Sequence, residues 1–158
     1  MNIGLTGTRQ GMTLPQKRVI KGLCEGLLAL NIIPIARHGD AIGSDATYDA
    51  AIRYYFPNTT IHIHPPLNPK YRAFCDGPHT IIHPEKEFGV RDRDIVNAVN
   101  KMLATPRLME EELRSGTWQT IRYTKKAQKQ LLIIWPDGSL ENCFEFNLKD
   151  DSPSLFVK

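Results

Sequence analysis

The sequence predicts an α/β fold: a Rossmann-like three-layer domain with a mostly parallel five-stranded sheet, followed by a short C-terminal extension. Short apolar segments alternate with longer amphipathic segments over residues 1–136, which is the pattern of successive βαβ units. Turns of glycine and small polar residues follow the apolar segments, where an open sheet of this kind binds its ligands. The 158 residues suit one domain, so we assign residues 1–136 to it and the polar residues 137–158 to the extension.

In the first half of the chain, strands and helices alternate regularly. Thr13 and Ser44 are good helix-capping residues, and each precedes a segment with apolar residues at helical spacing. Pro57 ends the second helix because proline cannot continue it, and Pro65 ends a strand rich in β-branched residues. The expected elements are strands at residues 2–8, 32–36 and 59–64 and helices at residues 13–30 and 44–56.

In the second half, residues 65–87 interrupt the alternation. This segment contains five prolines and is longer than most loops inside compact domains. We therefore expect either a loop that covers a ligand or plain irregular packing. The elements expected after it are helices at residues 92–100 and 116–129, strands at residues 101–105 and 131–135, and a further short strand at residues 143–146.

The composition is that of a globular protein with a mildly basic surface. Apolar residues make up 41% and charged residues 23%, and the formal net charge is +3. These values exclude a disordered chain, and the charge is low for a dedicated duplex-DNA binder. Three cysteines without a Cys-x-x-Cys pair suggest reduced thiols, and no signal peptide or membrane span is recognisable. We expect a cytoplasmic protein that binds a small anionic ligand.

Three junctions between an expected strand and the next helix all contain glycine together with small polar residues. Residues 6–11 (TGTRQG) follow the first strand, residues 38–46 (HGDAIGSDA) follow the second, and residues 115–117 (SGT) precede the fourth helix. Glycine lets a ligand approach the backbone closely, and the unpaired N–H groups of a helix start attract anions. Arg9 adds a guanidinium that suits a phosphate. The junctions predict a phosphate-binding crevice.

Several other site types lack their signatures. The Gly-x-Gly-x-x-Gly fingerprint of dinucleotide-binding proteins, the P-loop and the Gly-x-Ser-x-Gly elbow are all absent. His62 and His64 share one face of a strand, yet the sequence shows no further ligand at a convincing spacing. We expect no metal and no cofactor.

Together these segments resemble the SLOG superfamily of Rossmann-like proteins. The matching patterns are GTR at residues 7–9, HGDAIGSDA at 38–46, HPP at 64–66, RDRDIV at 91–96 and SGTW at 115–118, and the resemblance covers about residues 2–136. The superfamily includes the DNA-processing protein A family and the LONELY GUY phosphoribohydrolases. The patterns are most similar to those of short bacterial and phage members.

The resemblance implies roles for particular residues. In the phosphoribohydrolases a Gly-Thr pair binds phosphate, and it corresponds to Gly116 and Thr117 here; Arg91 corresponds to an assisting arginine. The catalytic glutamate does not match, because Gln119 and Thr120 hold its two candidate positions. N-glycosidic hydrolysis or transfer therefore requires another carboxylate here.

The candidate site follows from the junctions and the resemblance. We expect Arg91, Asp45 and Asp40 to be catalytic if the protein is an enzyme. The expected ligand-binding residues lie at the junctions, in the long loop or on the third helix: Gly7, Thr8, Arg9, His38, Gly39, Gly43, Ser44, Lys70, Arg72, Arg93, Ser115, Gly116, Thr117, Trp118 and Gln119. Asp92 and Asp94 alternate with arginines, which also suits a local ion-pair ladder.

Three functions remain open at the level of sequence. The first is an enzyme that cleaves or transfers at the N-glycosidic bond of a nucleotide-derived small molecule. The second is a protein without catalysis that senses or sequesters such a ligand. The third is a single-stranded nucleic-acid binder that stacks bases on Tyr54, Tyr55, Tyr71 or Trp118. Relatives in the superfamily commonly form dimers, which implies a homodimer here.

Overall fold

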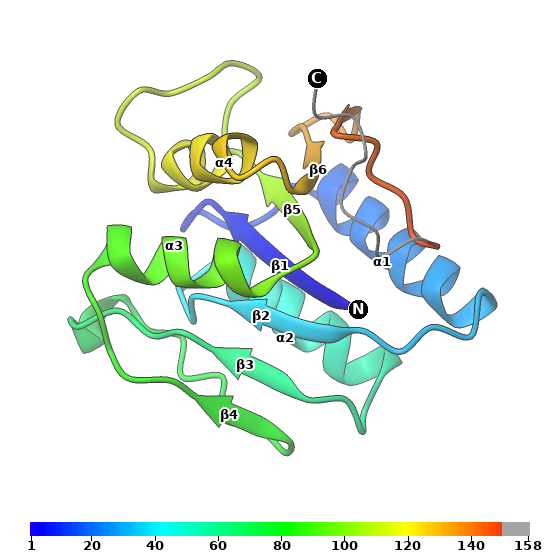
Figure 1. Cartoon of the computed structure of the whole chain (residues 1–158), viewed down its shortest axis with the longest axis horizontal. Helices are drawn as coiled ribbons and strands as arrows, with labels where there is room; N and C mark the ends of the chain where they lie inside the picture. Colours follow the sequence, from blue (N-terminus) through cyan, green and yellow to red (C-terminus); the bar gives the residue numbers. More distant parts are fainter. Residues whose placement is uncertain (150–158) are drawn as a thin grey trace.

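The computed structural model describes residues 1–149, which form an α/β fold around one mostly parallel sheet (Figure 1). The strand order is β4-β3-β2-β1-β5-β6-β7, and only β7 runs antiparallel to its neighbour. The fold class is confirmed, although the described residues give the sheet seven strands where five are predicted. The strands are β1 (Asn2–Gly7), β2 (Ile35–His38), β3 (Ile61–Ile63), β4 (Thr80–Ile82), β5 (Lys101–Thr105), β6 (Gln130–Ile134) and β7 (Leu140–Cys143).

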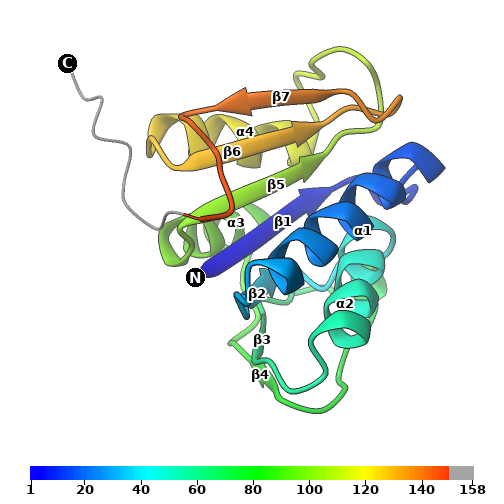
Figure 2. The same cartoon turned by 90° about the vertical axis from the view of Figure 1, so that its right-hand side faces the viewer.

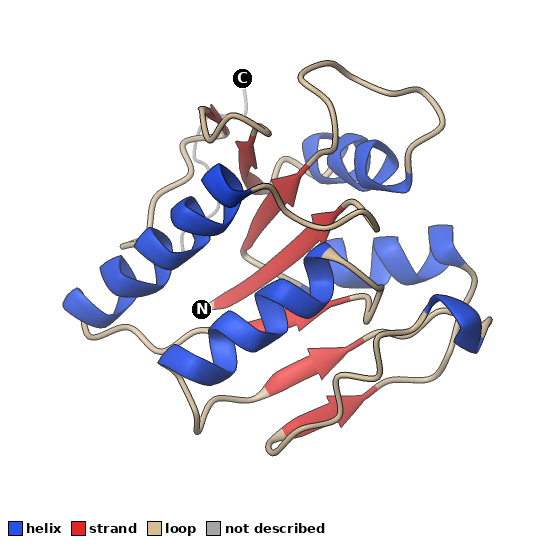
Figure 3. Cartoon of the chain, turned by 180° about the vertical axis from the view of Figure 1, so that it is seen from behind, coloured by secondary structure: helices blue, strands red, loops and turns tan. Residues whose placement is uncertain are grey.

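Four helices cover the two faces of the sheet. Helices α1 (Leu14–Ala29) and α2 (Ser44–Tyr55) pack together on one face, and α3 (Phe88–Ala98) and α4 (Gly116–Lys126) pack together on the other. Figure 3 shows the first pair in front of the sheet, whereas Figure 1 shows the second pair in front. The chain leaves β1 toward β2 on one side and reaches β5 on the other, so a topological switch point lies between β1 and β5.

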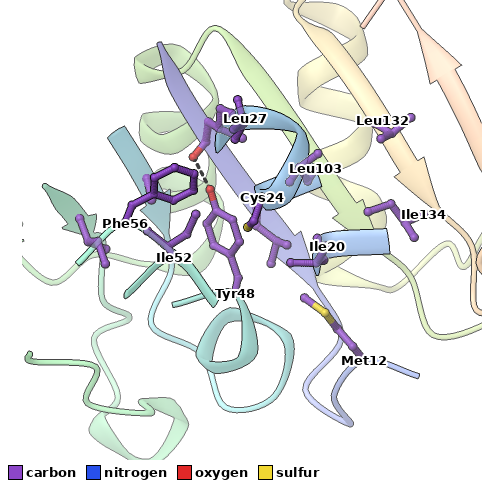
Figure 4. Close-up of a cluster of buried hydrophobic side chains, with 14 of the residues drawn as sticks. Met12, Ile20, Cys24, Leu27, Tyr48, Ile52, Phe56, Leu103, Leu132 and Ile134 are labelled. Carbon is purple, nitrogen blue, oxygen red and sulfur yellow. Dashed lines mark hydrogen bonds between the residues drawn. The ribbon is translucent and has the colours of Figure 1, made fainter. Parts of the chain in front are cut away.

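Local sequence explains the main elements. Thr13 caps α1, as the sequence predicts, and the structure adds a capping box with Gln16. The five residues of β5 and the five of β6 are all buried, because helices cover both faces of these central strands. Figure 4 shows the larger apolar cluster, in which the buried Tyr48 hydroxyl donates a hydrogen bond to the backbone oxygen of Ile3, 2.8 Å away. No helix within residues 1–149 has the length and apolarity needed to cross a membrane.

Several elements differ from the sequence prediction. Strand β2 begins at Ile35 rather than at residue 32, because Pro34 has no N–H for a strand ladder. Helix α3 begins at Phe88, four residues early, and the short strand β4 lies unforeseen inside the long loop. Strand β7 covers Leu140–Cys143, not residues 143–146, and extends the sheet beside β6 (Figure 2).

Candidate functional site

A cavity of about 570 Å³ opens at the carboxyl ends of β1 and β2, beside the switch point. Small-molecule sites of proteins usually have about this volume and this location in open α/β sheets. Its wall comes from the turns after β1 and β2, the start of α3, the loop before α4 and the first turns of α4. The lining residues used below are Gly7, Thr8, Arg9, Gly39, Asp45, Phe88, Arg91, Asp92, Arg107, Glu112, Arg114, Ser115, Gly116, Thr117, Gln119 and Thr120.

The structure brings ten of the sequence-predicted site residues to this cavity. These are Gly7, Thr8, Arg9, Gly39, Asp45, Arg91, Ser115, Gly116, Thr117 and Gln119. All three predicted junctions contribute, since the parallel strands end at the same edge of the sheet. Sequence reasoning left out Phe88, Asp92, Arg107, Arg114 and Thr120 as binding residues. Tertiary packing brings these residues to the cavity, and no local sequence pattern predicts it.

The remaining predicted residues lie elsewhere. Gly43 is the N-cap of α2 at φ 96°, where glycine is favoured, and Ser44 is fully buried behind it. Lys70 is exposed in the 3₁₀ turn Pro69–Tyr71, and Arg93 stacks on Tyr123 outside the cavity. Trp118 is buried in the core against Trp135, so it does not wall the cavity.

Asp40 and His38 hold the long loop in place and do not face the ligand space. The buried Asp40 carboxylate accepts hydrogen bonds from Arg72 Nε at 2.7 Å and from the backbone N–H of Cys75 at 2.9 Å. The buried His38 ring accepts the Asp40 N–H at Nδ1 and lies 2.8 Å from Asp49 at Nε2. These contacts attach the loop to the end of β2, so the catalytic role expected of Asp40 has no support from its position.

One group of possible metal ligands accompanies this anchor. Within residues 1–149, the ligand atoms of His38, Asp49 and Cys75 lie within 4.8 Å of one another. However, Arg53 contacts both carboxylate oxygens of Asp49, at 2.6 and 3.3 Å, and burial and nearby carboxylates raise the pKa of the Cys75 thiol. Asp49 is thus already paired with a guanidinium and the Cys75 thiol keeps its proton, so the group is better explained as an anchor.

The start of α4 provides the features of an anion site. Ser115 caps the helix by accepting the N–H of Trp118, which leaves the N–H groups of Gly116 and Thr117 at the cavity wall. Arg114 lines the same wall and has no carboxylate partner within the described residues, whereas Arg107 pairs with Glu112 at 2.6 Å. In Figure 1 the loop that carries these arginines rises from the end of β5 to the start of α4.

Arg9 is held at the rim by two aromatic rings. Its guanidinium lies 4.2 Å from the centroid of the Tyr71 ring and 5.1 Å from that of Phe88. The long loop therefore contacts the rim residue Arg9 through Tyr71, and such cation–π contacts orient the charge without neutralising it. Together with Arg114 and the α4 amides, Arg9 gives the cavity a net attraction for anions.

Arg91 and two carboxylates form a buried group that also lines the cavity. Arg91 is 7% exposed; its Nε lies 2.9 Å from Asp92, and its Nη1 donates to the backbone oxygens of Gly39 and His64. Asp45 accepts the N–H groups of Gly39 at 3.1 Å and Ala41 at 3.0 Å. Arg91, which the sequence predicts to be catalytic, is thus anchored in the cavity wall.

The environment of Asp92 favours its protonated form. Burial raises its pKa to about 6, and the nearby charge of Asp45 adds to this, although Arg91 and the Thr120 hydroxyl oppose it. Burial likewise raises the pKa of Asp45. Asp92 can therefore hold or release a proton near neutral pH, which is the property required of a general acid or base. Thr120, one of the two positions to which the predicted resemblance assigns a glutamate, lies beside this carboxyl.

Gly39 packs directly on Arg91, and we expect a large cost for any side chain there. A Cβ at Gly39 would lie 2.0 Å from Arg91 Nη1 and 2.6 Å from Cζ, and the guanidinium cannot withdraw without losing its buried partners. We expect Gly39→Ala to lower the free energy of unfolding by about 1–3 kcal/mol, measured by urea denaturation. Gly22→Ala is the control, since nothing lies within 4 Å of that site on α1. Equal stability of Gly39→Ala and wild type would contradict this packing.

Comparisons with known proteins support the fold. No protein-family model matches the chain, and no curated protein matches its sequence. A molybdenum cofactor binding protein from the phototrophic bacterium Rippkaea orientalis has a similar structure, with a TM-score of 0.61 and 14% identity over 85% of this chain and 76% of that chain. TM1055, a structural genomics target, gives a TM-score of 0.56 and 11% identity over 82% and 71% of the two chains. These likenesses confirm the Rossmann-like fold, and membership of the SLOG superfamily stays a prediction.

Proposed function

We propose that the protein binds a phosphorylated nucleoside, or a small molecule derived from one, in the cavity at the switch point. The observation that carries this proposal is that the α4 start, Arg114 and Arg9 all line this one cavity. Helix-start amides and guanidinium groups are the ordinary protein ligands of a phosphate. The similarity to a cofactor-binding protein agrees with a small-molecule ligand.

The cavity also offers a place for a base and a sugar. Phe88 lines it and packs against Tyr71, with ring centroids 5.7 Å apart, so an aromatic surface lies beside the cationic one. Asp45 and Gln119 supply acceptors for hydroxyl or amide groups. These groups line one cavity of limited volume, which suits a small ligand better than the extended basic groove of a single-strand binder.

The phosphate should contribute most of the affinity. We expect AMP and ADP-ribose to bind about 10 to 100 times more tightly than adenosine, because one charge-assisted contact contributes roughly 1.5–3 kcal/mol. Isothermal titration calorimetry measures this difference directly. Arg114→Ala should remove most of it, whereas Arg18→Ala, an exposed arginine on α1, should leave it unchanged. Equal affinity for adenosine and AMP would contradict the phosphate site.

A specific observation favours turnover of this ligand over binding alone. Asp92 lines the cavity, has a pKa of about 6, and lies beside Thr120 on α4, the helix whose start forms the anion site. In N-glycosidic hydrolysis the C1′–N bond breaks with its electron pair on the base, the acid protonates that base, and water adds to C1′ and gives up a proton. Asp92 would supply the first proton and recover the second, and Asp45 would stabilise positive charge on the sugar. Without turnover, the same site would sense or sequester its ligand.

A further inference from the structure

Two of the arginines that line the cavity are paired with carboxylates that line it as well. Arg91 pairs with Asp92, and Arg107 pairs with Glu112. The Glu112 carboxylate accepts a hydrogen bond from Arg107 Nη2 at 2.6 Å, which is a charge-assisted contact. Glu112 therefore engages a guanidinium of the same kind that the proposed site offers to a phosphate.

The two pairs differ in how firmly the arginine is held. Arg91 is 7% exposed and also donates to the backbone oxygens of Gly39 and His64, so it cannot leave its place in the wall. The Arg107 side chain is 46% exposed, and its contact with Glu112 joins one nitrogen to one oxygen. Ion pairs that are this exposed contribute little to stability, because water competes for both charges. Arg107 can therefore exchange its partner at low cost, whereas Arg91 cannot.

The loop between β5 and α4 directs Glu112 toward the cavity (Figure 1). Arg122 of α4 donates to the Glu111 carboxylate at 2.7 Å and to the backbone oxygen of Leu113 at 3.2 Å, so both neighbours of Glu112 are attached to the helix. The Glu112 side chain is 23% exposed and lines the cavity, whereas that of Glu111 is 51% exposed and does not line it. Glu111 thus attaches the loop, and Glu112 brings a negative charge to the cavity wall.

Given the proposed function, on which this inference rests, we propose that Arg107 is a further phosphate-binding residue and that Glu112 is its internal competitor. A phosphate monoester has about −1.5 to −2 charges and three strong acceptor oxygens at pH 7, more than a carboxylate offers. The phosphate of the ligand therefore displaces Glu112 from Arg107 on binding. Glu112 lowers the affinity of the site for phosphorylated ligands, because it must first be displaced and its charge repels theirs.

The test is calorimetric titration of the wild type and of Glu112→Gln with AMP at pH 7.5, with adenosine as the uncharged probe. We expect Glu112→Gln to bind AMP about tenfold more tightly, since it frees Arg107 and removes a like charge. Its affinity for adenosine should be unchanged. Glu111→Gln is the matched control, because it removes the same charge from the next residue, which pairs with Arg122 outside the cavity. It should bind AMP as the wild type does.

A double variant tests the role of Arg107 itself. Arg107→Ala in the Glu112→Gln background should remove most of the gain in AMP affinity, because the freed guanidinium is then absent. If the double variant bound AMP as tightly as Glu112→Gln, Arg107 would not be a phosphate ligand and the proposal would be wrong. The melting temperature of each variant without ligand establishes that it is folded.

The remaining outcomes separate this inference from the proposed function. If the wild type prefers AMP over adenosine and Glu112→Gln binds AMP no more tightly, Glu112 only braces the loop, and the phosphate site stands without it. If neither protein binds AMP at millimolar concentration, both proposals fail. Binding of AMP by Glu112→Gln alone would support both, since the carboxylate then blocks the site in the wild type.

Discussion

Replacing Arg91 with alanine should destabilise the protein by about 3–5 kcal/mol, the usual cost of removing one partner from a buried ion pair. The guanidinium is 7% exposed, pairs with Asp92 at 2.9 Å and donates to the backbone oxygens of Gly39 and His64. Its loss leaves a carboxylate and two carbonyl groups without their partner. Chemical denaturation with urea measures the change, and ligand affinity should be measured below the denaturation range.

The size of this loss should depend on pH. Removing the positive charge raises the pKa of Asp92 further above its value of about 6 in the wild type, so the variant keeps a neutral Asp92 in mildly acidic solution. The destabilisation should therefore be smaller at pH 5 than at pH 8. Arg93→Ala is the neighbouring control, since Arg93 is exposed and only stacks on Tyr123. Equal stability of Arg91→Ala and Arg93→Ala would mean that Arg91 serves the ligand alone.

The positions of the junction residues could be predicted because they depend on topology. Gly7, Gly39 and Gly116 all reach the cavity, since parallel strands place the turns at their carboxyl ends along one edge of the sheet. The alternation of strands and helices also identified the layers correctly. These features need only local pattern and the handedness of βαβ connections.

The positions and roles of the individual carboxylates could not be predicted in this way. Asp40 and Asp45 both follow β2, yet Asp40 faces Arg72 from the long loop and Asp45 faces the cavity. Asp92 looks like one member of a surface ion-pair ladder in the sequence, whereas α3 begins at Phe88 and turns it into the cavity wall. The edge strand β4 is three residues long, which is too short to recognise within a proline-rich loop. Long-range packing decides each of these cases.

If Asp92 is the general acid of the proposed turnover, Asp92→Asn should slow the release of free base strongly. We expect the wild type to release free base from a nucleoside monophosphate, and the variant to be 10²- to 10⁴-fold slower, because general acid–base catalysis contributes about that factor. Chromatographic assay of the released base measures both rates. Asp94→Asn is the matched control, since Asp94 pairs with Lys86 away from the cavity.

The pH profile distinguishes a catalytic Asp92 from a structural one. An acid with a pKa of about 6 is protonated below that pH, so the rate should fall as pH rises through 6, and this fall should be missing from any residual activity of Asp92→Asn. Asp92→Asn also takes the partner from the buried Arg91 guanidinium, so urea denaturation of the variant must show that it is folded under the assay conditions. A wild type that binds AMP but never releases base would contradict catalysis and leave the binding site intact. In that case Gln119→Glu, which places a carboxylate at the cavity, should introduce slow hydrolysis.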